Sequence, residues 1–163
     1  MNYFKISLGI FIVLAASRFV PHPPNFTSLI ALSFYVPAIL GIKFIPALVI
    51  SFVITDLLIE FHGLTLFTWS SVILIGLISK FFLLNVSNRV AGSLLAAFLF
   101  YLITNFGVWS VGSYGYSLEG LLTCYVLAIP FFGQTVFSTL VYACIIEFLL
   151  FTNKKFEIIE IKN

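Results

Sequence analysis

Charged residues are scarce in this chain, and their scarcity argues against a soluble fold. The 163 residues include eight Lys and Arg and six Asp and Glu, so only 9% are charged. A typical soluble domain carries about 25% charged residues. So few charged side chains cannot cover a water-facing surface of this size. We therefore expect the hydrocarbon of a lipid bilayer to surround most of the protein.

Several functional signatures are also missing. The net charge is only +2, and no long basic run indicates a nucleic-acid partner. The sequence contains no phosphate-binding glycine loop, no His-Glu-x-x-His pair and no serine in a nucleophile elbow. His22 and His62 are isolated imidazoles without further ligands around them. We therefore expect no enzymatic activity, no metal site and no cofactor.

Hydrophobic residues make up 61% of the chain and include 20 Phe. Polar and turn residues divide them into about six apolar segments, each near the length that crosses a bilayer. The segments are 3–17, 26–42, 44–59, 64–84, 90–111 and 121–151, and the last is expected to break near Pro130 and Gly133. The pattern predicts an all-α, polytopic membrane protein. It has one domain over residues 1–152, a bundle of about six transmembrane helices, and a short polar cytoplasmic tail over 153–163.

Basic residues are distributed very unevenly between the two sides of such a bundle. With the N-terminus inside, the cytoplasmic side receives Lys5, Lys43, Lys80, Arg89, Lys154, Lys155 and Lys162. Only Arg18 falls on the outside. Because Lys and Arg accumulate on the cytoplasmic side of short loops, both termini are expected to be cytoplasmic. An alternative treats the first segment as a cleaved signal peptide, with small residues at Ala15-Ala16-Ser17.

Polar side chains near or inside the predicted spans gather in the outer half of the membrane, where they would be costly without a function. The candidate ligand-binding residues are Arg18, His22, Asn25, Asp56, Glu60, Trp69, Asn105, Trp109, Tyr125 and Gln134. A few hydrogen-bonding groups among aromatic walls are typical of a small-molecule pocket. The inner half offers no comparable set, and Lys80 and Glu147 are expected to reach water at the inner helix ends.

Simpler interpretations of the same residues remain open. Arg18 could form only an interfacial ion pair, with either Asp56 or Glu60 as its partner. Trp69 and Trp109 could belong to the belt of aromatic residues at the membrane surface. Asn105 lies inside a predicted span, where its amide needs a hydrogen-bond partner.

Three short motifs carry a resemblance to known proteins. They are Arg18-Phe-Val-Pro-His-Pro-Pro-Asn-Phe-Thr27, Asn105-Phe-Gly-Val-Trp109 and Ile129-Pro-Phe-Phe132. In these motifs the chain resembles an uncharacterised bacterial family of membrane transport proteins, a domain of unknown function. In size, span count and its early Pro-Pro-Asn element it also resembles the S components of energy-coupling-factor importers. That resemblance implies an S-component-like bundle in the bacterial inner membrane, working with a transmembrane coupling protein and ATPases.

The sequence therefore predicts a substrate-binding subunit of an importer for a vitamin-like or other micronutrient, with its pocket facing the outside. A non-catalytic structural or assembly subunit of a larger membrane complex is the main alternative. A membrane-embedded enzyme using Asp56, Glu60 and His62 as acid–base groups is a third possibility, for which the sequence shows no further motif.

Overall fold

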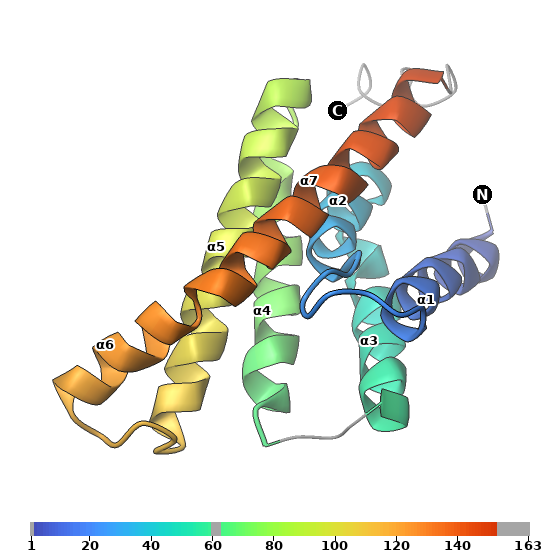
Figure 1. Cartoon of the computed structure of the whole chain (residues 1–163). Helices are drawn as coiled ribbons and strands as arrows, with labels where there is room; N and C mark the ends of the chain where they lie inside the picture. The colour runs from blue at the N-terminus through green and yellow to red at the C-terminus, as the bar shows by residue number, and fades with distance from the viewer. Residues whose placement is uncertain (1, 60–62, 153–163) are drawn as a thin grey trace.

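The computed structural model describes residues 2–59 and 63–152, which form seven α-helices and two short 3₁₀ helices and contain no strand (Figure 1). The elements in chain order are α1 (Tyr3–Phe19), α2 (Leu29–Leu40), η1 (Ile42–Phe44), α3 (Ile45–Ile59), α4 (Thr65–Ile78), η2 (Ser79–Phe81), α5 (Val86–Ser110), α6 (Leu118–Leu127) and α7 (Ile129–Thr152). The all-helical fold class is confirmed for these residues.

Three helical stretches are long and apolar enough to cross a membrane. They are Ile42–Ile59, which joins η1 to α3, and the whole of α5 and α7. Shorter apolar helices are α2, α6 and the stretch Thr65–Phe81 formed by α4 and η2. These lengths support a membrane protein, as the composition predicts.

The segment expected to be the second span is shorter than predicted. We expected residues 26–42 to cross the membrane, but α2 has only 12 residues, which extend over about 18 Å, whereas the hydrocarbon core is about 30 Å thick. Three prolines precede the helix, and Asn25 adopts a left-handed conformation with φ 62°, so the backbone cannot become helical before Ser28. At the other end Gly41, with φ 94°, terminates it.

Despite its length, α2 forms the centre of the bundle. All nine residues from Leu29 to Pro37 are buried, and α1, α3, α4, α5 and α7 all pack against the helix. Two glycines of α5 allow close helix packing. A Cβ atom on Gly92 would lie 2.5 Å from Phe34 of α2, and one on Gly107 would lie 2.5 Å from Phe67 of α4.

The last apolar segment is interrupted, as the sequence predicts. The chain turns at Ala128, between α6 and α7, two residues before Pro130. Because proline has no backbone N–H, it cannot donate the hydrogen bond that would continue α6. The proline instead occupies the first turn of α7, where the missing donor costs little.

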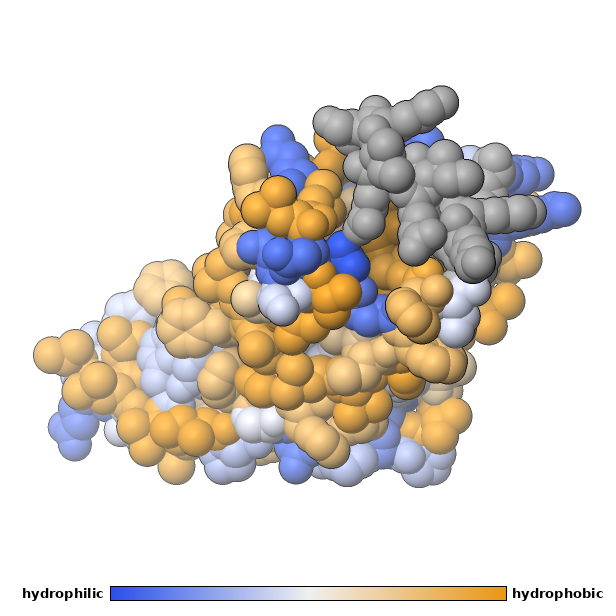
Figure 2. Space-filling model, turned by 90° about the horizontal axis from the view of Figure 1, so that it is seen from above, coloured by the Kyte–Doolittle hydropathy of each residue, from blue (hydrophilic) through white to orange (hydrophobic). Residues whose placement is uncertain are grey.

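The helices run in alternating directions, so that α3 and α5 begin, and α4 and α7 end, at the upper end of the bundle in Figure 1. Lys43 in η1, Lys80 in η2 and Arg89 in α5 therefore lie at one end. Seen from that end, apolar side chains cover most of the visible surface and polar ones form separate small groups (Figure 2).

Candidate functional site

Three of the expected site residues meet where the end of α1 packs against α3, which in turn packs against α4. Nη2 of Arg18 lies 2.6 Å from Oδ1 of Asp56, and Nε1 of Trp69 donates a hydrogen bond of 2.8 Å to Oδ2 of the same carboxylate. The Asp56 side chain is only 2% exposed and that of Arg18 is 15% exposed. Each side chain comes from a different helix, so this cluster, which we call the Arg18 cluster, connects α1, α3 and α4.

Further contacts position the guanidinium of Arg18. Its Nη1 donates to Oγ1 of Thr55 at 2.6 Å and reaches the carbonyl oxygen of Phe52 at 3.5 Å. The carbon of the guanidinium lies 4.7 Å from the centre of the Phe52 ring. Phe52, Thr55 and Asp56 share one face of α3 because they are separated by three and four residues. A buried cation is stabilised in this way by a carboxylate, neutral acceptors and an aromatic ring.

Of the two partners that the sequence left open for Arg18, Asp56 forms an ion pair with it. The other candidate, Glu60, lies outside the described residues. The connection to the centre of the bundle is short. Ser17, next to Arg18, shares a hydrogen bond of 2.8 Å with Ser28, the residue before α2. The Arg18 cluster is therefore joined directly to the central helix.

A second group of polar side chains joins α5 to α6. The hydroxyl of Tyr125 donates to the carbonyl of Leu102 at 2.7 Å, and the hydroxyl of Tyr101 donates to the carbonyl of Tyr125 at 2.6 Å. Asn105 donates to the Tyr101 carbonyl at 2.8 Å, one turn earlier in its own helix. This contact supplies the hydrogen-bond partner that the Asn105 amide needs inside the helix.

Among the described residues, the other expected site residues make no side-chain hydrogen bond to either group. Nε1 of Trp109 donates to the Ser117 carbonyl at 3.2 Å and so holds the loop before α6. The ring of His22 contacts backbone oxygens only, in the part of the chain described. Asn25 and Gln134 are exposed. The structure thus brings Arg18, Asp56 and Trp69 together, whereas Tyr125 bonds to Leu102 and the Asn105 amide bonds within its own helix.

A buried ion pair at the opposite end of the bundle was not predicted from the sequence. Nε and Nη2 of Arg89 in α5 each lie 2.8 Å from a carboxylate oxygen of Glu147 in α7. The two side chains are only 9% and 11% exposed. The expectation that Glu147 reaches water is therefore wrong, because its carboxylate is held between helices by a bidentate contact. The position of Glu147 within the apolar sequence of α7 could have indicated that its carboxylate needs a basic partner.

Tyr35 of α2 lies next to this ion pair. The side chain is 1% exposed, and both Glu147 and Arg89 act electrostatically on its hydroxyl. The hydroxyl oxygen has no hydrogen-bond partner that meets normal geometry among the described residues. A buried hydroxyl without a partner is uncommon, and this one lies in the centre of the bundle.

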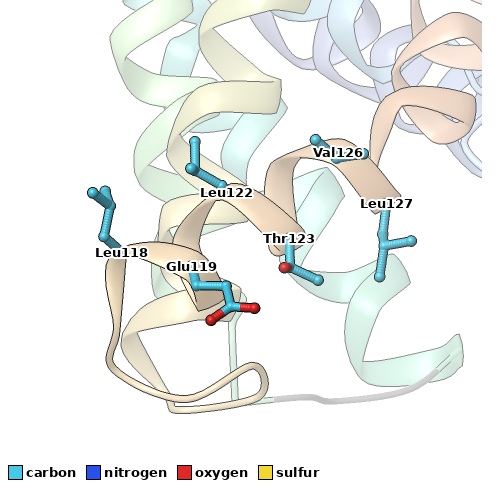
Figure 3. A pocket seen from close by; sticks show the side chains of 6 residues that line it. All are labelled: Leu118, Glu119, Leu122, Thr123, Val126 and Leu127. Carbon is cyan, nitrogen blue, oxygen red and sulfur yellow. The ribbon is translucent and has the colours of Figure 1, made fainter.

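A shallow groove lies on the outer surface of α6 (Figure 3). Its lining comes from that helix alone and consists of Leu118, Glu119, Leu122, Thr123, Val126 and Leu127. None of the expected site residues lines it. A mainly apolar helix face of this kind suits contact with lipid chains.

The described residues contain no group of three or more His, Cys, Asp and Glu side chains that could hold a metal ion. Besides Tyr35, the buried polar side chains among the described residues are Asp56, Arg89 and eleven serines and threonines. The partly exposed Arg18 and Trp69 add a guanidinium and an indole, which can bind a ligand by hydrogen bonds and ring contacts.

Comparisons with known proteins place the chain in a family without assigning it an activity. Neither a curated protein nor a solved structure matches the chain. The model of a family of unknown function, DUF6580, matches residues 2–158, almost the whole length. The chain therefore belongs to this family of unknown function.

Proposed function

We propose that this protein is the substrate-binding membrane subunit of an importer for a small, vitamin-like molecule. The observation that carries the proposal is the Arg18 cluster. Three helices contribute a guanidinium, a carboxylate and an indole to one place in a mainly apolar bundle. Ionisable groups within a membrane protein are costly and usually mark a path or a binding site.

The position of the cluster fits uptake from outside. The elements η1 and η2 and the first turn of α5, which contain Lys43, Lys80 and Arg89, lie at the opposite end of the bundle from the last turn of α3, which contains Asp56. If that basic end faces the cytoplasm, as the distribution of Lys and Arg favours, then the Arg18 cluster belongs to the outer half. The same orientation places both termini in the cytoplasm of a bacterial cell. In this proposal six helical segments traverse or enter the bilayer, with α2 buried among the others.

Ligand contacts would come from the exposed part of Arg18 and from aromatic rings near it. Trp69 packs against the hydrophobic core while its indole nitrogen contacts Asp56, and Phe52 supplies a second ring beside the guanidinium. The chain shows no nucleotide-binding motif, so energy for transport would come from a transmembrane coupling protein and ATPases as partners.

Ligand binding can be measured by tryptophan fluorescence, because the chain has only two tryptophans. In the Trp109→Phe variant, in detergent or nanodiscs, Trp69 is the sole reporter. A panel of thiamine, riboflavin, nicotinamide, pyridoxine, pantothenate and biotin would be titrated. We expect saturable quenching by at least one compound, and its loss in the Trp109→Phe/Arg18→Met variant.

A matched control is Lys5→Met, which removes an exposed cation from the same helix α1 and should leave binding unchanged. Saturable binding that persists after Arg18→Met would contradict the proposed site. If no compound binds and the protein instead copurifies stoichiometrically with a fixed partner, the assembly role replaces the importer role.

A further inference from the structure

Building on the proposed importer function, we infer that the ligand is electrically neutral and presents a hydrogen-bond acceptor, such as a carbonyl oxygen or a ring nitrogen, to Arg18. From the sequence alone, Arg18 is expected to attract either an anionic group or a carbonyl group. The contacts within the Arg18 cluster favour the neutral acceptor, because they determine which charges and which donors remain available to a ligand.

The charges of Arg18 and Asp56 disfavour an ionic ligand. Arg18 and Asp56 are 2.6 Å apart, so together they carry no net charge. An anionic ligand placed against Arg18 would also lie close to the Asp56 carboxylate, and in a poorly solvated site the repulsion is only weakly screened. A cationic ligand would meet the guanidinium in the same way. The pair therefore disfavours both kinds of ion.

The Asp56 carboxylate is buried and occupied. Both oxygens of Asp56 already accept a contact, Oδ1 from Arg18 and Oδ2 from Trp69. The Asp56 side chain is 2% exposed, and that of Arg18 is 15% exposed. Of the two charged residues, Arg18 is therefore the one that a ligand can reach.

The guanidinium of Arg18 retains N–H donors for a ligand. A guanidinium carries five N–H groups. The contacts of Arg18 with Asp56, Thr55 and the Phe52 carbonyl use three of them. Among the described residues no acceptor is assigned to Nε of Arg18. The remaining donors can bind a neutral acceptor without removing Asp56 from its pair, and the rings of Phe52 and Trp69 provide apolar contact.

The test uses pairs of compounds that differ mainly in charge. Nicotinamide and nicotinate form one pair, biotinamide and biotin a second, and pyridoxine and 4-pyridoxate a third. Affinities are measured by Trp69 fluorescence in the Trp109→Phe background. We expect the neutral member of any pair that binds to bind at least tenfold more tightly than the carboxylate.

Asp56→Asn should reverse this preference. The asparagine oxygen can still accept from Trp69, but the site now carries the positive charge of Arg18, so the carboxylate member should bind more tightly. The double variant Arg18→Gln/Asp56→Asn is neutral again and should favour the neutral member. It keeps the inference testable if the single variant does not fold.

The outcomes separate the inference from the proposed function on which it rests. Tighter binding of the carboxylate by the Trp109→Phe protein, or an unchanged preference in a folded Asp56→Asn variant, would overturn the neutral-ligand inference while leaving ligand binding established. Absence of saturable binding by every member of every pair would instead count against the binding function itself.

Discussion

Replacing Arg89 by methionine should destabilise the protein strongly. The change leaves the carboxylate of Glu147, which is 11% exposed, without the guanidinium that contacts both of its oxygens at 2.8 Å. Breaking a buried ion pair by removing one partner costs about 3–5 kcal/mol. In a bilayer or micelle the unfolded state also finds polar partners, which lowers such values. We therefore expect a loss of about 3 kcal/mol, a change of about 100-fold in the unfolding equilibrium.

The measurement is equilibrium unfolding by SDS in dodecyl maltoside micelles, followed by far-UV circular dichroism. The double variant Arg89→Met/Glu147→Leu removes both charges and should recover stability to within about 1 kcal/mol of the wild type, since well-packed apolar residues can replace a buried pair. Lys5→Met is the matched control, because Lys5 is an exposed cation of α1, and it should change stability by less than about 0.5 kcal/mol.

Two results would refute this reasoning. The first is an Arg89→Met variant as stable as Lys5→Met, which would mean that the carboxylate is well solvated or has other partners. The second is a double variant no more stable than Arg89→Met, which would assign the loss to packing of the arginine stem.

Two further substitutions test the packing of the bundle by the same unfolding assay. Tyr35→Phe removes a buried hydroxyl without a hydrogen-bond partner among the described residues, so stability should stay equal or rise by about 1 kcal/mol; a comparable loss would show that the hydroxyl bonds to Glu147. Gly107→Ala places a Cβ atom 2.5 Å from Phe67 and should cost about 1–3 kcal/mol. Gly133→Ala, with no atom within 4 Å, is its control and should be neutral or stabilising.

Helical content and its main interruptions could be predicted because they depend on local chemistry. The prolines before α2 and Pro130 act through the missing N–H group and the fixed φ of proline, whatever surrounds them. Asn85 and Ser117 each accept a hydrogen bond from the backbone three residues later and cap α5 and α6. The predicted segments, from 90 and 121, begin four and three residues later than these helices. The length of α2 was harder to predict, because an apolar segment that spans a bilayer and one that forms a short buried helix have the same hydropathy pattern.

The candidate site was only partly predictable. The sequence indicated that Arg18 needs an acidic partner, but the choice of Asp56 depends on which face of α3 meets the end of α1. Arg89 seemed to belong to a polar loop and Glu147 to a helix end, yet the two residues, 58 positions apart, form a buried pair. No local sequence pattern predicts that α5 and α7 pack side by side.

By itself the sequence determined the environment of this protein, because a chain with 9% charged residues cannot form a water-facing surface. It also determined that the chain is helical, since backbone groups in hydrocarbon must bond within their own segment. Only the tertiary structure decided that the charges of Arg18 and Asp56 cancel and that α2 lies at the centre. Both depend on contacts between residues far apart in the chain, and the free energy of a buried charge is set by those contacts rather than by its neighbours in sequence.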